Sequence, residues 1–269
     1  MGSVARLAPA AGLAPARAVA LRSTDVGPGA DMVALTSLAA LNKHLDMKSV
    51  IPLPPQALRF MAEDDARFVS IGNEHLDFAL RYVIPTSVLD IGCGYGRFAY
   101  ALRARGFKGR YTGVDVLERQ IDWLNEHFVD PGYRFTTVDI QNDRYNPQGA
   151  TSADGVRLPE VAPDLITVLS VFTHMYDRDI EAYLRAIRAV LTPDGVAYVT
   201  AFILGGERRN PFDAKHRIAD HCYTANPDDP LHVIAYDEAW LRRTIDAAGL
   251  ELRELVYGYQ DRLVLTPRS

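Results

Sequence analysis

The chain has 269 residues, of which 48% are hydrophobic and 23% are charged, a composition that is typical of a globular protein and excludes a disordered chain. Its 34 acidic and 29 basic residues give a formal net charge of −5, which argues against a protein that binds nucleic acid through a basic surface. The 2 cysteines are too few for a disulfide framework, and no apolar run has the length of a transmembrane helix. We therefore expect a cytoplasmic protein without a membrane span.

The first part of the chain differs in composition from the rest. Residues 1–49 are rich in alanine, proline and glycine, and we expect them to form a flexible extension with a short helix. Residues 50–269 are expected to form a single domain. A helix is predicted near its start, over residues 70–83, with Ser70 as N-cap and Pro85 ending the run.

After this helix, short apolar runs rich in β-branched residues alternate with amphipathic stretches. Such alternation predicts a doubly wound, mostly parallel α/β sheet with helices on both faces. The last two strands are joined by only a few residues, so we expect them to pair antiparallel, because a parallel pair needs a long crossover. The predicted strands cover residues 87–91, 110–115, 133–139, 165–170, 196–202, 252–257 and 262–265, and the predicted helices cover residues 96–105, 118–128, 178–191 and 237–248.

A glycine-rich turn follows the first predicted strand and opens a helix, as a nucleotide-binding loop requires. Its glycines are Gly92, Gly94 and Gly96. A dinucleotide fingerprint has its third glycine one place later, where this chain has Arg97. Asp90 precedes the loop, and a carboxylate there suits a ligand with an ammonium group better than a pyrophosphate. Both features disfavour an NAD(P)-dependent Rossmann oxidoreductase, which stays open as the alternative.

Two further strands also end in acidic residues, Asp115 after the second strand and Asp139 after the third. The carboxyl ends of parallel strands meet at the edge of the sheet where ligands bind. A carboxylate at the position of Asp115 can accept hydrogen bonds from both ribose hydroxyls, and it can also cap the following helix. The three carboxylates together predict a ligand site at this edge.

In order and spacing, residues 88–102, 111–124, 135–140 and 164–175 resemble the core motifs of class I S-adenosylmethionine-dependent methyltransferases. The resemblance covers residues 70–266. It implies a Rossmann-like fold with a seven-stranded sheet whose last strand is antiparallel, and it implies S-adenosyl-L-methionine as the cofactor.

The resemblance also assigns roles to individual residues. Asp90 and the glycine-loop backbone would hold the methionine end of the cofactor, and Asp115 would bind its ribose. Asp139 would accept a hydrogen bond from the adenine amino group, and the amide of Ile140 would donate to the adenine ring. The predicted cofactor-binding residues are Asp90, Gly92, Cys93, Gly94, Asp115, Val116, Asp139, Ile140 and Ser170.

The exit of the fourth predicted strand indicates the kind of acceptor. Methyltransferases of this fold that act on DNA or protein glutamine carry an Asp/Asn-Pro-Pro-aromatic motif there, whereas this chain has Ser170-Val171-Phe172-Thr173. Metal-dependent catechol-type enzymes need acidic ligands after the fourth and fifth strands, and the fifth strand is followed by none. We therefore expect a small-molecule substrate, no nucleic-acid partner and no metal.

His174 is the candidate general base, because the ordinary pKa of imidazole lies near neutrality and suits removal of a hydroxyl proton. It could instead cap the next helix or pack against the cofactor. The chain is thus predicted to be a metal-independent O-methyltransferase, with a non-catalytic S-adenosylmethionine-binding protein as a further alternative.

Two segments, residues 51–84 and 204–235, are expected to cover the substrate, because long irregular loops in a compact domain are usually functional. The basic residues of the second segment indicate either a solvated surface or an acceptor with a carboxylate or phosphate. The notable side chains of the two segments are Arg59, Phe60, Phe68, His75, Arg208, Arg209, Lys215, His216, Arg217 and Tyr223.

Overall fold

The computed structural model describes residues 51–205 and 212–268, which belong to a compact unit that begins at Ile51. The predicted extension over residues 1–49, and the side chains of Arg208 and Arg209, lie outside these residues. No helix in the described part of the chain is long and apolar enough to cross a membrane.

The described chain alternates strands and helices from residue 65 onward. The helices are α2 (Asp65–Ala79), α3 (Arg97–Ala104), α4 (Glu118–His127), α5 (Asp177–Val190) and α6 (Glu238–Ala247), with 3-10 turns η2 (Gln56–Leu58), η3 (Ala153–Gly155), η4 (Phe172–His174) and η5 (Pro230–His232). The strands are β1 (Ser87–Ile91), β2 (Arg110–Asp115), β3 (Tyr133–Thr137), β4 (Leu165–Val168), β5 (Val196–Leu204), β6 (His216–Arg217), β7 (Cys222–Thr224), β8 (Ile234–Asp237), β9 (Leu250–Val256) and β10 (Asp261–Pro267).

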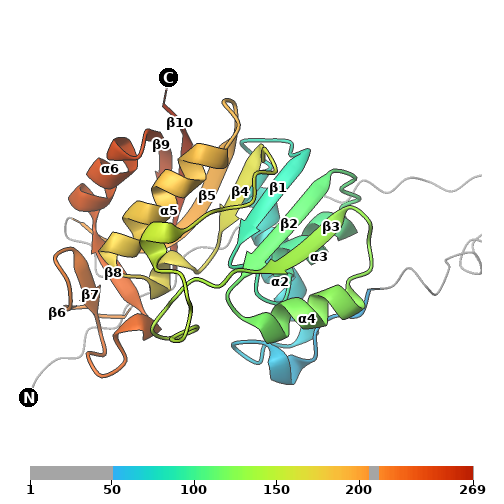
Figure 1. Ribbon diagram of the computed structural model, residues 1–269, viewed down its shortest axis with the longest axis horizontal. Coiled ribbons are helices and arrows are strands. Elements are labelled where there is room, and N and C mark those ends of the chain that lie inside the picture. Colours follow the sequence, from blue (N-terminus) through green and yellow to red (C-terminus); the bar gives the residue numbers. More distant parts are fainter. Residues whose placement is uncertain (1–50, 206–211, 269) are drawn as a thin grey trace, which may run out of the picture. The chain divides into compact units, whose positions relative to one another are not determined.

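Seven of the strands pair in the order β3-β2-β1-β4-β5-β10-β9 (Figure 1). The neighbours from β3 to β5 are parallel, and β10 lies antiparallel between β5 and β9. This arrangement confirms the predicted Rossmann-like sheet, including the antiparallel last strand. The strand count differs from seven, because β8, β7 and β6 extend the sheet beyond β5.

Strand β5 changes partners along its length. Its first part pairs with β10 over Ala197–Ala201, and its last part pairs in parallel with β8 over Phe202–Leu204. The three extra strands come from residues 216–237, a region without clear periodicity in the sequence. They are only 2 to 4 residues long, which is too short to produce a recognisable alternation.

Alternate residues of the central strands point to opposite faces of the sheet, and both faces are covered by helices. Leu89 and Ile166 belong to one apolar cluster, which includes side chains of α5 and α6. Val88 and Leu165, their chain neighbours, belong to a second cluster, which includes side chains of α2, α3 and α4. Burial on both faces explains why these strands are rich in apolar residues.

The predicted start of the first helix is wrong. Helix α2 begins at Asp65 instead of residue 70, because the side chain of Asp64 caps it by accepting a hydrogen bond from the Arg67 amide at 2.7 Å. Ser70 lies inside the helix, which ends at Ala79, before Pro85.

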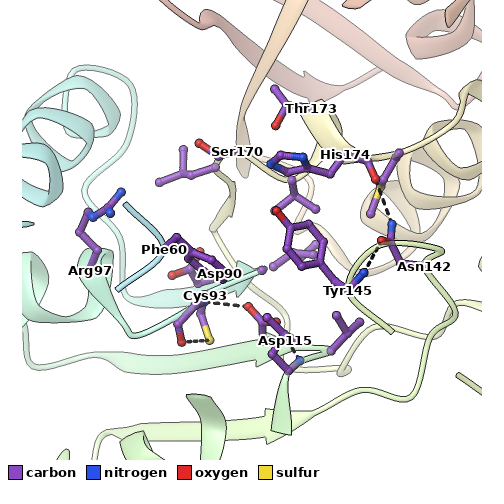
Figure 2. A pocket seen from close by; sticks show the side chains of 18 of the residues that line it. Phe60, Asp90, Cys93, Arg97, Asp115, Asn142, Tyr145, Ser170, Thr173 and His174 are labelled. Atoms are coloured by element: carbon purple, nitrogen blue, oxygen red, sulfur yellow. Dashed lines mark hydrogen bonds between the residues drawn. The ribbon is translucent and has the colours of Figure 1, made fainter. Parts of the chain in front are cut away.

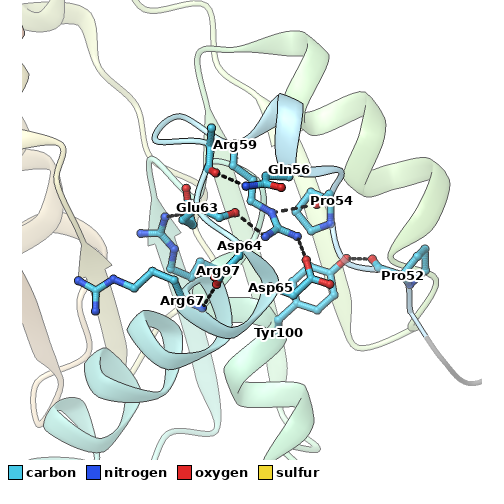
Figure 3. Close-up of polar contacts among 11 residues, drawn as sticks. Pro52, Pro54, Gln56, Arg59, Glu63, Asp64, Asp65, Arg67, Arg97 and Tyr100 are labelled. Atoms are coloured by element: carbon cyan, nitrogen blue, oxygen red, sulfur yellow. Dashed lines mark hydrogen bonds and ion pairs between the residues drawn. The ribbon is translucent and has the colours of Figure 1, made fainter.

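Residues 52–64, which we call the strap, are held against the domain by polar contacts (Figure 3). The Arg59 guanidinium is buried, donates from Nε to the Pro54 carbonyl at 2.9 Å and from Nη1 to the Glu63 carbonyl at 2.8 Å, and pairs with Asp65. The Tyr100 hydroxyl donates to the strap at the Pro52 carbonyl. One arginine therefore fixes both halves of the strap.

We expect Arg59→Lys to loosen the strap, because an ammonium cannot reproduce the three-way contacts of a planar guanidinium. Loss of one charge-assisted hydrogen bond, worth about 1.5–3 kcal/mol, corresponds to roughly tenfold or greater local opening. Hydrogen exchange should therefore quicken about tenfold in the strap and stay unchanged in β1. Arg67→Lys, which alters an exposed side chain, is the control. Equal protection of the strap in both variants would contradict this role of Arg59.

Candidate functional site

A cavity of about 530 Å³ lies at the carboxyl ends of the central strands (Figure 2). Its lining comes from the strap, the glycine loop, the ends of β2, β4 and β5, and the turn between β9 and β10. Eight of the nine predicted cofactor residues line it, namely Asp90, Gly92, Cys93, Gly94, Asp115, Val116, Ile140 and Ser170.

The glycine loop presents backbone without side chains to this cavity. Gly92 has a φ of 71°, and a Cβ there would lie 2.3 Å from a methyl carbon of Val171. Gly94 has a φ of 54°, and the ring of Phe60 lies 3.5 Å from the place of its missing Cβ. Only glycine fits at Gly92, because a side chain would clash with Val171, and both positions have a backbone conformation that favours glycine. The contact of Phe60 also shows that the strap reaches over the loop.

Asp115 joins the glycine loop to the next helix. Its carboxylate is buried and accepts hydrogen bonds from the Gly94 amide at 2.8 Å and from the Leu117 amide at 3.0 Å. Burial raises the pKa of this carboxyl group. Each carboxylate oxygen has a second acceptor site, so the structural role leaves room for hydrogen bonds to a ligand.

Asp90 is a buried carboxylate at the base of the same loop. One oxygen accepts from the Tyr111 hydroxyl at 2.6 Å and the other from the Thr167 hydroxyl at 2.7 Å. These bonds do not compensate for the lost hydration, and burial raises the pKa of Asp90 from 3.8 to about 6. The charged form of Asp90 therefore lowers the stability of the folded protein.

We expect Asp90→Asn to stabilise the protein at pH 8. The folded pKa of Asp90 lies above its unfolded value, so its ionisation weakens folding fully above pH 6 and not at all below about pH 3.8. A rise of about two pH units corresponds to about 3 kcal/mol, and imperfect amide packing should leave a gain of about 2 kcal/mol. Denaturant unfolding at pH 8 and pH 4 measures it. The same gain at both pH values would contradict this origin.

The third predicted carboxylate, Asp139, lies outside the cavity lining. Its side chain is exposed and accepts from Asn146 Nδ2 at 3.3 Å and from the Ala150 amide at 3.2 Å. Strand β3 ends at Thr137, so Asp139 belongs to the loop that follows it. The structure thus brings Asp90 and Asp115 to the cavity, while Asp139 points to its own loop.

Ser170 follows β4 in a strained conformation, with a φ of 58°. Such a backbone costs a non-glycine residue about 1–3 kcal/mol and needs support from its surroundings. The Ser170 amide donates to the Thr200 hydroxyl at 2.8 Å, and the Ser170 hydroxyl donates to Gln260 Oε1 at 3.0 Å. Gln260, in the turn before β10, is a site residue that sequence reasoning missed.

His174 ends the 3-10 turn η4 and lines the cavity. Its Nδ1 lies 2.8 Å from the Leu231 carbonyl oxygen, and burial lowers the pKa of the imidazole. The ring of Tyr145 packs edge-on against it, with centroids 5.2 Å apart. Asn142 connects the two residues, because it donates to the His174 carbonyl at 2.9 Å and accepts from the Tyr145 amide at 3.0 Å (Figure 2).

The two predicted cover segments contribute unequally. From the first, Arg59, Phe60, Phe68 and His75 line the cavity. Burial lowers the pKa of His75 to about 4, and its Nδ1 lies 2.8 Å from the Tyr198 hydroxyl. The second segment's Lys215, His216, Arg217 and Tyr223 do not line the cavity.

Two basic side chains in the described part of the second segment have acidic partners outside the cavity. Lys215 pairs with Asp213, and Arg217 pairs with Asp220. These contacts are on exposed side chains, which favours the expected solvated surface. Within the described ranges, no group of three or more His, Cys, Asp or Glu side chains is arranged to hold a metal ion.

The chain matches a known protein family over most of its length. Residues 55–255 match a protein family described as a methyltransferase domain. A Mycobacterium tuberculosis protein (strain ATCC 25618 / H37Rv) named as a methyltransferase is 59% identical over 32 residues, which cover 12% of this chain and 19% of that protein. The match therefore spans about a fifth of that relative's length.

Two solved structures share the fold at low identity. The CcbJ methyltransferase from Streptomyces caelestis has a TM-score of 0.51 and 17% identity, over 73% of this chain and 94% of that chain. Human N-acetylserotonin methyltransferase has a TM-score of 0.53 and 16% identity, over 87% of this chain and 66% of that chain. At such low identity, these two structures show only that the fold is shared. Family membership rests on the match over residues 55–255. The resemblance found in the sequence to class I S-adenosylmethionine-dependent methyltransferases is confirmed, and the chain belongs to the methyltransferase-domain family.

Proposed function

We propose that this chain transfers the methyl group of S-adenosylmethionine to a hydroxyl oxygen of a small molecule, with His174 as general base. The supporting observation is the contact between His174 Nδ1 and the Leu231 carbonyl. A carbonyl only accepts hydrogen bonds, so Nδ1 carries the proton and Nε2 keeps a free lone pair. Because burial lowers the pKa of His174 below 6.5, the imidazole is neutral near pH 7 and ready to accept a proton.

The residues around the glycine loop fit this cofactor. Asp115 has acceptor sites left for the ribose hydroxyls, since the Gly94 and Leu117 amides use only one site on each oxygen. Asp90 would face the ammonium of the methionine end. Asp139 as partner of the adenine amino group rests on the sequence resemblance. When bound, the cofactor supplies a methyl group on a positively charged sulfur, which an oxygen nucleophile can displace directly.

The chain's own contribution is alignment and proton removal. Direct displacement depends on the geometry between the acceptor oxygen and the methyl carbon, and holding both in one site removes much of the entropic barrier. In the proposed transfer, the acceptor oxygen would form a bond to the methyl carbon, the electrons of the broken sulfur–carbon bond would remain on sulfur, and the hydroxyl proton would pass to His174 Nε2. No metal is needed for this step.

The function can be tested by incubating the full chain with S-adenosylmethionine that carries a deuterated methyl group and a panel of small alcohols, phenols, amines and thiols. Mass spectrometry of the products should show the label on oxygen. Label only on nitrogen, sulfur or carbon would contradict O-methylation. Thermal stabilisation by the cofactor without any transfer would favour a non-catalytic binding protein, and stabilisation by NAD or NADP alone would favour an oxidoreductase.

A further inference from the structure

One part of the cavity is lined by three aromatic side chains, Phe202, Phe212 and Tyr259, which we call the aromatic wall. Their rings contact one another edge to face, with centroid distances of 4.9 Å, 6.1 Å and 5.7 Å. Phe202 is 3% exposed and Tyr259 is 69% exposed. The wall therefore extends from the protein interior to the surface.

The aromatic wall is connected to the segment that carries His174. Gln260, the neighbour of Tyr259, accepts the hydrogen bond from Ser170 at 3.0 Å. On the other side, Val233 packs in one cluster with Phe202 and Phe212. Val233 follows closely on Leu231, whose carbonyl contacts His174. An acceptor ring held by the wall would thus share one cavity with the proposed base.

A second polar group accompanies the imidazole. Thr173 is 1% exposed and belongs to the residues that line the cavity, and its buried hydroxyl has no hydrogen-bond partner among the described residues. A buried hydroxyl without a partner is unfavourable, so a ligand that supplies one is stabilised. Figure 2 shows Ser170, Thr173 and His174 along one side of the cavity. This edge suits a hydroxyl, which both donates and accepts.

The charges of the lining disfavour an anionic acceptor. The three arginines that line the cavity in the described part of the chain already have acidic partners: Arg59 pairs with Asp65, Arg97 with Glu63, and Arg144 with Asp229. The lining also holds four acidic side chains, Glu63, Asp90, Asp115 and Asp179, so a carboxylate or phosphate on the acceptor would meet no excess of positive charge. The acceptor is therefore expected to be neutral.

We infer that the acceptor is a flat, uncharged aromatic alcohol whose ring packs on the aromatic wall and whose hydroxyl lies at Thr173 and His174. This inference rests on the proposed O-methyl transfer. Edge-to-face and stacked ring contacts add selectivity beyond buried area, roughly two- to tenfold for each aromatic partner. A phenolic hydroxyl also gives up its proton to an imidazole more readily than an aliphatic one does.

The test measures binding, so that it does not depend on turnover. The full chain is saturated with S-adenosylhomocysteine and titrated in a calorimeter with 2-naphthol, its saturated analogue decahydro-2-naphthol, and 2-naphthoic acid. We expect 2-naphthol to bind about tenfold more tightly than the saturated alcohol, and the acid to bind more weakly than 2-naphthol. Phe212→Leu and Tyr259→Leu should each reduce the preference for 2-naphthol to threefold or less.

The control variant is Tyr257→Leu, because Tyr257 precedes the same turn and does not line the cavity. It should keep the tenfold preference, and all variants should keep their affinity for S-adenosylhomocysteine. Equal binding of the two alcohols, tighter binding of the acid, or no binding of 2-naphthol would overturn the inference. Selective binding of 2-naphthol without methyl transfer from S-adenosylmethionine would refute the proposed function alone, whereas transfer only to aliphatic alcohols would refute the aromatic acceptor alone.

Discussion

Replacing His174 by glutamine is expected to lower kcat about 10²–10⁴-fold, the usual effect of removing a general base, while cofactor affinity stays unchanged. Glutamine keeps a polar amide near the position of Nε2 but cannot take up a proton. Burial lowers the pKa of His174 below 6.5, so the wild-type rate should rise with pH through that lowered pKa and then level off. The variant should lose this rise.

Steady-state kinetics between pH 5 and pH 8 separate the roles of His174. A loss that falls mainly on KM, with the pH dependence retained, would assign it to substrate positioning. Full activity with an unaltered pH profile would exclude both roles and leave alignment alone to drive the transfer. His216→Gln is the matched control, because His216 is exposed and does not line the cavity.

The second large effect is expected at Asp115. Asp115→Asn should weaken S-adenosylmethionine binding on the order of 100-fold, since charge-assisted hydrogen bonds to the ribose at about 1.5–3 kcal/mol each are weakened or lost. Asparagine keeps one acceptor oxygen for the Leu117 amide, so the start of α4 should persist. Asp115→Ala should bind as weakly and fold less well, because it leaves the Gly94 and Leu117 amides without their acceptor.

Calorimetry with the folded variants measures this effect, and Asp139→Asn gives the comparison. Asp139 is exposed and held by Asn146 and Ala150 in its own loop, so its replacement tests whether the side chain turns to the adenine when the cofactor binds. A loss of tenfold or more would support the role implied by the resemblance. Unchanged affinity in the Asp115 variant would remove that residue from the cofactor site.

The central sheet could be predicted from sequence because its strands and helices each leave a pattern within a short stretch of residues. Strands such as Leu165–Val168 are buried on both faces and are therefore rich in apolar residues, and the helices between them carry one apolar side. The start of α2 was missed because Asp64 lies before the apolar residues that define the helix. Strand β8 was missed because it exists through its pairing with the end of β5.

The same distinction holds for the site. Glycines and carboxylates at strand ends were found because strand, turn and helix are adjacent in the sequence. The environment of His174 could not be found in this way, because its partners Asn142 and Leu231 come from distant loops and show no sequence pattern of their own. The orientation of Asp139 was also unpredictable, since it depends on which loop amides compete for its carboxylate.

The change of partners along β5 has a consequence for how this fold can diversify. The part of β5 within Ala197–Ala201 is locked between β4 and β10, and residues Phe202–Leu204 are paired with an appended sub-sheet. Insertions or exchanges between residues 212 and 237 alter that appendage without shifting the register of the strands that carry the glycine loop. The appended strands can therefore vary as one module while the strands that carry the glycine loop stay intact, and grafting that module onto a relative would test this independence.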